Sequence, residues 1–202
     1  MSGLCIPTLR HTPYITFIHR IIMKKIIIAL VVAALLASCN LFRLDEPRED
    51  LGLQRRQYTG KELRTDGYYL AKSTRENRLG LIVLYRNGVC LCTYIMKGGS
   101  DTKQYIENDV LQNKPYMRSL FEKPTGIGTF MITKRTIALQ AWKYKNKHST
   151  IVVDYIGEVI NDTTLRVNTI TEFDSNTPQF AYDIFHFVPF THKPDSTTSF
   201  IK

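Results

Sequence analysis

Apolar and polar residues alternate with a period of two over most of the chain from residue 58 onward. This period is typical of β-strands, because successive side chains of a strand point to opposite faces. It predicts eight strands, which begin near residues 67, 79, 89, 128, 137, 150, 164 and 181. Between the second and third strands, Asn87-Gly88 indicates a tight hairpin, since both central residues of such a turn need a positive φ.

Residues 101–122 depart from this alternation and predict helix. Ile106 and Val110 recur at helical spacing, Asp101 is a predicted N-cap, and Pro115 divides the segment into two short helices or a helix and a loop. Eight antiparallel strands in succession can close into an up-and-down barrel, which leaves no exposed edge. We therefore predict an all-β fold, an eight-stranded antiparallel meander that forms a lipocalin-like barrel with a short helical insertion. A two-sheet β-sandwich is the alternative.

The N-terminal region has the order of a secretory signal: a basic start at Lys24-Lys25, an apolar run over residues 26–37, and small residues after it. The run is too short for a spanning helix, which needs roughly 20 apolar residues. Leu36-Ala37-Ser38-Cys39 resembles the lipobox of bacterial lipoproteins. The resemblance implies cleavage between Ser38 and Cys39 and a lipid on the Cys39 thiol, and two or more acyl chains anchor a protein stably to a membrane.

Three segments follow from this reading of the N-terminus. Residues 1–38 are the predicted signal peptide, and residues 1–22 within it are a wrongly assigned start or a leader. Residues 39–57 form a lipidated tether, and residues 58–202 form the barrel domain. No internal repeat and no second domain boundary is visible in the sequence.

Composition and charge narrow the class of protein further. The 44% of hydrophobic residues, with many aromatics, excludes wholesale disorder. The net charge of +9 falls to +5 after Cys39, because Arg10, Arg20, Lys24 and Lys25 precede it and no acid does. The high pI is therefore poor evidence for nucleic acid, and we predict no nucleic-acid partner for a lipid-anchored envelope protein.

Several segments together resemble a group of small lipoproteins from Bacteroidetes-type bacteria. These are residues 63–69, 84–89, 157–165 and 193–197, in addition to the lipobox. The resemblance implies a lipocalin-like β-fold and a lipid-anchored location in the outer membrane, but no catalytic residues. The acidic residues within 45–50 resemble a surface-export signal of such lipoproteins, and an ordinary solvated linker is the alternative. The periplasmic and the surface orientation therefore both stay open.

A barrel with an open interior would hold an apolar ligand, whereas a filled barrel would only bury its core. Inward side chains would line an open interior. The candidates for this lining are Tyr68 or Tyr69, Leu84, Phe130, Trp142 and Phe187. That these residues simply fill the core is the alternative.

Three lysines form a basic cluster in the predicted fifth strand. Lys143, Lys145 and Lys147 alternate with Trp142 and Tyr144, so the lysines share one strand face and the aromatics share the other. One interpretation is a contact for anionic glycans or lipid head groups. The other is a solvated hairpin whose aromatic residues pack inward.

Cys90 and Cys92 lie two residues apart in a predicted strand, so both thiols face the same side. Two thiols alone do not make a zinc site, which takes four ligands. We expect buried, inert thiols, no metal and no cofactor.

The favoured function is a binding or structural role in the envelope, with an apolar ligand or a protein partner, and no enzymatic activity. The alternative is an envelope hydrolase that uses His186 with nearby carboxylates. His186 lies between Phe185 and Phe187 and therefore points to the opposite strand face from both. The chain contains no GxSxG, HExxH or P-loop motif.

Overall fold

The computed structural model describes residues 50–72, 78–96, 101–122, 125–146, 149–175, 177–198 and 200–201. The elements within these residues follow the chain in this order: β1 (Gly67–Lys72), β2 (Arg78–Leu84), β3 (Val89–Met96), α2 (Thr102–Gln104), the π-helical segment η2 (Tyr105–Leu111), α3 (Lys114–Glu122), β4 (Ile127–Thr133), β5 (Thr136–Asn146), β6 (Ser149–Asn161), β7 (Thr164–Glu172) and β8 (Gln179–Pro189).

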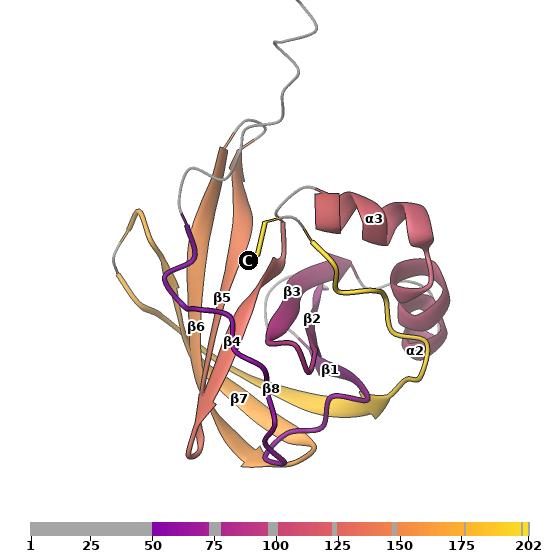
Figure 1. Ribbon diagram of the computed structural model, residues 1–202, viewed down its shortest axis with the longest axis horizontal. Helices are drawn as coiled ribbons and strands as arrows, with labels where there is room; N and C mark the ends of the chain where they lie inside the picture. The colour runs from indigo at the N-terminus through magenta and orange to yellow at the C-terminus, as the bar shows by residue number, and fades with distance from the viewer. Residues whose placement is uncertain are drawn as a thin grey trace, which may run out of the picture. The chain divides into compact units, whose positions relative to one another are not determined.

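The strands form a closed antiparallel barrel in chain order (Figure 1). Each strand pairs with the next, and β8 returns to β1 in a register that runs from Gly67↔Pro189 to Leu70↔His186. The predicted eight-stranded barrel is therefore confirmed. The alternative of a β-sandwich is wrong, because the pairing of β1 with β8 closes the strands into one sheet without free edges.

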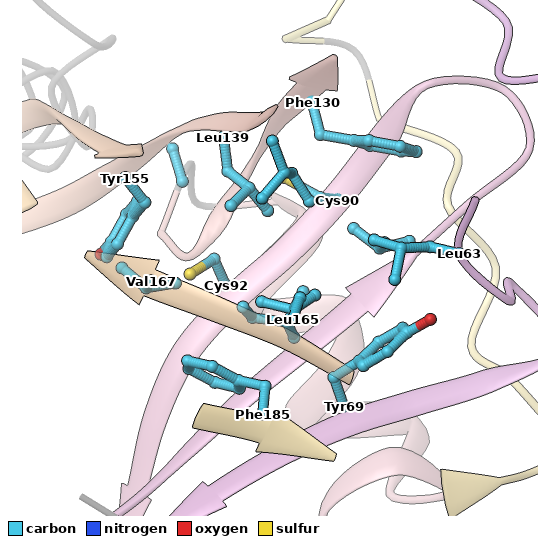
Figure 2. Packing of buried hydrophobic residues seen from close by; sticks show 14 of the residues in the cluster. Leu63, Tyr69, Cys90, Cys92, Phe130, Leu139, Tyr155, Leu165, Val167 and Phe185 are labelled. Carbon is cyan, nitrogen blue, oxygen red and sulfur yellow. The ribbon is translucent and has the colours of Figure 1, made fainter. Parts of the chain in front are cut away.

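The barrel interior is filled by side chains from all eight strands, which we call the inner cluster (Figure 2). Its buried members include Tyr69 from β1, Leu84 from β2, Phe130 from β4 and Phe185 from β8. These positions alternate with outward residues along each strand, as the pleat of a strand requires. The interior is thus a packed core, not an empty calyx, along most of its length.

A second group of apolar side chains, the outer cluster, covers the outside of β1 to β3. Ile106 and Val110 of η2 and Met117 and Phe121 of α3 pack there. Figure 1 shows the helical segment beside β1 to β3. Strand β2 is consequently buried on both faces, which explains why its sequence reads as a continuous apolar run and not as an alternation.

The helical insertion has the caps that its sequence predicts. The Asp101 carboxylate accepts a hydrogen bond from the Gln104 amide at 3.0 Å, as an N-cap does. Pro115 lies in the first turn of α3, where its missing N–H costs no hydrogen bond, so the chain forms two short helices. No helix within the described residues is long and apolar enough to cross a membrane.

Of the two residues predicted to have a positive φ in the β2–β3 turn, Gly88 has one and Asn87 does not, so that part of the prediction is wrong. Gly88 has φ 86°, and the Gly88 amide donates to the Tyr85 carbonyl at 3.0 Å. A Cβ at position 88 would lie 2.1 Å from the Arg56 carbonyl oxygen. The glycine therefore serves the turn and also leaves room for the chain segment before β1.

Residues 50–57, which the sequence assigns to the tether, pack along the outside of the barrel. The Leu53 amide donates to Gln140 Oε1 at 2.8 Å, and Thr129 Oγ1 donates to the Leu53 carbonyl at 2.7 Å. Arg55 Nε donates to the Asn87 carbonyl at 2.9 Å. This segment thus runs along β4 and β5 towards the β2–β3 turn.

The C-terminal tail is held to the same side of the barrel by Lys193. Its ammonium donates to the carbonyls of Thr65 at 2.7 Å and Leu84 at 2.6 Å and lies 4.2 Å from the centroid of the Tyr85 ring. Burial lowers the pKa of Lys193 to about 8, since desolvation outweighs the neighbouring Asp66 carboxylate. The tail is therefore fixed through a lysine whose ammonium group loses its proton at a lower pH than that of an exposed lysine.

Candidate ligand site at the barrel mouth

One end of the barrel is closed by the segment that precedes β1. Leu63 is only 1% exposed and belongs to the inner cluster. The segment is tied to the barrel by the Tyr58 amide, which donates to the Arg86 carbonyl at 2.8 Å, and by the Arg64 amide, which donates to the Asp162 carbonyl at 3.0 Å. In Figure 2, Leu63 lies at one side of the cluster and Tyr155 at the other.

The other end of the barrel holds a pocket of about 230 Å³, which we call the mouth pocket. Its lining comes from the parts of β2, β3, β5, β7 and β8 that lie opposite the closed end, and from Tyr155 in the middle of β6. The lining residues are Arg78, Tyr94, Lys143, Tyr155, Ile170, Glu172, Gln179, Phe180, Ala181 and Asp183. Polar and apolar side chains thus meet at the end of the barrel opposite Leu63.

A carboxylate is part of the buried wall of this pocket. Asp183 is only 8% exposed, and its Oδ2 accepts a hydrogen bond from the Tyr94 hydroxyl at 3.4 Å. A buried carboxylate is costly unless it is paired or hydrogen-bonded. The two groups therefore form a buried polar point in a wall that also contains the apolar side chains of Ile170, Phe180 and Ala181.

Tyr155 lies deeper and hydrogen-bonds with Cys92. Burial raises the pKa of the Tyr155 hydroxyl well above its ordinary value, and the Cys92 thiol beside it acts in the same direction. Burial also raises the pKa of Cys92 to about 12. Both groups are neutral at physiological pH, so the floor of the pocket carries hydrogen-bonding groups and no charge.

The rim of the pocket carries ion pairs that cross β6. Lys143 Nζ lies 2.7 Å from Glu172 Oε1, and Lys145 pairs with Asp174. All four side chains are partly exposed, so each pair contributes little stability. Their effect is to place both signs of charge beside the opening.

The predicted lining residues divide between the two clusters. Tyr69, Leu84, Phe130 and Phe187 belong to the inner cluster, but none of them lines the mouth pocket. The prediction that Trp142 faces inward is wrong. Of the two alternatives Tyr68 and Tyr69, Tyr69 faces inward and Tyr68 faces outward. Tyr68 packs in the outer cluster beside Phe190, and Trp142 packs there beside Phe200.

In β5, lysines and aromatic residues occupy opposite strand faces, as predicted, but the lysines and not the aromatic residues are on the inward face. Lys143 and Lys145 lie on the strand face that continues the barrel interior, where they pair with acids of the β7 end. Trp142 and the partly exposed Tyr144 point outward, so the interpretation in which the aromatics pack inward is wrong. Lys147 lies outside the described residues.

His186 and Asp183, its nearest carboxylate in the chain, lie on opposite faces of β8. His186 is exposed on the outer face, as predicted from the inward Phe185 and Phe187, whereas Asp183 faces the interior. Among the residues that the structure describes, no three His, Cys, Asp or Glu side chains cluster as metal ligands would. Cys90 and Cys92 are buried free thiols, as expected.

Sequence reasoning missed the polar residues of the mouth pocket, namely Tyr94, Tyr155, Glu172 and Asp183. Period-2 alternation could have placed each on the inward face of its own strand. Their convergence depends on the register of strands that are up to 89 positions apart in sequence, as for Tyr94 and Asp183.

A closed eight-stranded barrel with a pocket at one end is the class of protein that the described residues define. Residues 23–40 match the family model of the prokaryotic membrane lipoprotein lipid attachment site. The chain is therefore a lipid-anchored lipoprotein of the bacterial envelope, and the predicted lipobox is confirmed. Cleavage between Ser38 and Cys39 stays a prediction. No curated protein and no solved structure matches the chain.

Proposed function

We propose that this protein is an outer-membrane lipoprotein that binds a small amphiphilic ligand, or the end of a larger one, in the mouth pocket. The observation that carries the proposal is the buried Asp183–Tyr94 pair in the wall of a pocket at the end of the barrel opposite Leu63. Convergent polar groups in an apolar pocket are typical of a ligand site. The outer-membrane location rests on the lipid attachment site together with the resemblance to Bacteroidetes-type lipoproteins.

The size of the pocket limits the ligand. A pocket of about 230 Å³ is smaller than the roughly 300–1,000 Å³ that drug-sized ligands occupy. Deeper entry would require displacement of inner-cluster residues beside Tyr155, such as Cys92 and Val167 (Figure 2). The packing therefore favours a ligand with one ring or one short apolar group inside the mouth, and not a whole acyl chain inside the barrel.

The chemistry of the lining indicates which polar groups the ligand carries. Ile170 and Ala181 offer an apolar wall, while Asp183 accepts hydrogen bonds from a donor such as an amine or a hydroxyl. The Lys143–Glu172 pair at the rim can exchange partners with a group of either charge. A neutral polar or zwitterionic head on a small apolar body fits this combination best.

Photo-crosslinking in living cells tests the proposal without knowledge of the ligand. Benzoylphenylalanine replaces Gln179, which lines the mouth pocket, and as a matched control Gln57, which is exposed next to the closed end. We expect light to add a small mass to the protein labelled at position 179 and not to the one labelled at position 57. Crosslinks from position 179 to whole proteins would indicate a protein partner and would overturn the small-ligand proposal, as would the absence of any specific adduct.

A further inference from the structure

The outer face of β8 carries large apolar side chains that none of the described helices and strands covers. Phe180 is 67% exposed, Tyr182 64% and Ile184 44%, and these alternate residues point to the same side of the strand. Ile156 of β6 is also exposed and lies in the same cross-strand row, because Ile156 pairs with Thr169 and Thr169 pairs with Phe180. We call Phe180, Tyr182, Ile184 and Ile156 the β8 apolar face.

Two local features distinguish this face from scattered exposed residues. The rings of Phe180 and Tyr182 stack with centroids 5.9 Å apart and an interplanar angle of 9°. Tyr182 has φ 53°, a left-handed backbone that bulky residues rarely adopt, at a point where the pairing of β7 with β8 is irregular. Such strain often accompanies functional positions. Contiguous exposed apolar side chains commonly mark an interaction surface.

The lipid anchor keeps the barrel close to a bilayer. Asp50, where the described chain begins, follows Cys39 by eleven residues, which can span at most about 36–40 Å. Strand β6, with 13 residues, is about 43 Å long, so the barrel stays within roughly its own length of the membrane. A short tether makes a second contact with the same membrane effectively intramolecular, so that even a weak contact is populated.

We propose that the β8 apolar face rests on the bilayer interface to which the lipid anchors the chain. Tyrosine and phenylalanine suit this position, since their rings are apolar and a phenol keeps its hydroxyl at head-group level. The nearest ion pair of the face, Arg166 with Glu158 at 2.7 Å, carries no net charge. The contact therefore depends on apolar insertion, and salt has little effect on it. Phe180 also lines the mouth pocket, so the mouth opens beside the membrane surface.

Quenching by brominated lipid tests this contact directly. Trp142 is the single tryptophan of the chain, so Trp142→Phe gives a dark background for a probe at position 182, Tyr182→Trp. The acylated protein is reconstituted into phosphatidylcholine vesicles with brominated or plain acyl chains. Tyr116→Trp on α3, at a site 37% exposed, is the matched control. Circular dichroism verifies that each variant is folded.

We expect the probe at position 182 to lose most of its emission in brominated vesicles, at low and at high salt, while the probe at position 116 keeps its emission. Phe180→Trp provides a second probe on the same face if Tyr182→Trp does not fold. Equal emission in brominated and plain vesicles would overturn the proposal. Protection of the face by a second copy, seen as a dimer in native mass spectrometry with no quenching, would overturn it too.

Discussion

Leu63 closes one end of the barrel although it belongs to no strand, and Leu63→Ala tests whether this closure stabilises the fold. The side chain is 1% exposed and packs in the inner cluster. The backbone of Leu63 is held in place by Tyr58, because the Leu63 amide donates a hydrogen bond to the Tyr58 hydroxyl at 2.9 Å. This backbone contact limits how far the segment can collapse into the space that the substitution leaves.

The expected loss follows from burial and from this restricted collapse. Replacement of a buried leucine by alanine costs about 2–5 kcal/mol, with larger values where the site cannot relax. We expect about 3 kcal/mol for Leu63→Ala. For a domain of this size, each kcal/mol lowers the melting temperature by about 2–4 °C, so the melting temperature should fall by about 6–12 °C.

Urea unfolding and thermal melting, both followed by circular dichroism, measure this loss. Leu120→Ala is the matched control, because Leu120 is only partly buried on α3 and packs against the outer cluster. We expect the control to lose less than half as much. Equal losses in the two variants, or a loss below about 1 kcal/mol for Leu63→Ala, would refute the argument that Leu63 is a buried plug.

The remaining predictions concern a close backbone approach, a buried lysine and two buried thiols. Gly128→Ala should destabilise the protein by about 1–3 kcal/mol or more in urea unfolding, since the new Cβ would lie 1.8 Å from a carbonyl oxygen of β5, and an unchanged midpoint would contradict this. The pKa of Lys193 is lowered to about 8 in the fold from 10.5, so between these values the unfolded chain binds more protons and the free energy of unfolding rises with pH. In Lys193→Met this rise should be missing, and identical pH profiles of the two proteins from pH 8 to 10 would show that the lysine is not buried. Cys90 and Cys92, whose pKa values burial raises, should react with iodoacetamide only after unfolding, and labelling of the native protein by mass spectrometry would contradict their burial.

The sequence predicts the strands and the barrel because local patterns determine them. The Asn87-Gly88 turn and the alternation of Ile137, Leu139 and Ala141 are properties of neighbouring residues. The same alternation already places Trp142 on the face opposite to these three residues, so the local pattern itself contradicts an inward Trp142. Helices and the C-terminal tail cover that outer face, which is why a large aromatic residue is buried there.

The mouth pocket could not be predicted in the same way, because it depends on long-range register. Tyr94 and Asp183 meet only after β8 has closed against the other strands. In β2, where both faces are buried, the apolar run gives no alternation that separates inside from outside. Charged residues such as Lys143 and Glu172 look like ordinary surface positions until their strands are paired across β6.

Native mass spectrometry of the acylated protein from its own membrane is the most direct test of the claim that the mouth pocket binds a ligand. The comparison needs three proteins: wild type, Ala181→Trp, which fills the mouth pocket, and Ala138→Trp, which adds the same bulk on the outer face of β5. We expect a small molecule to remain bound to the wild type and to Ala138→Trp and to be absent from Ala181→Trp. A ligand retained equally by all three proteins, or bound by none of them, would contradict the account.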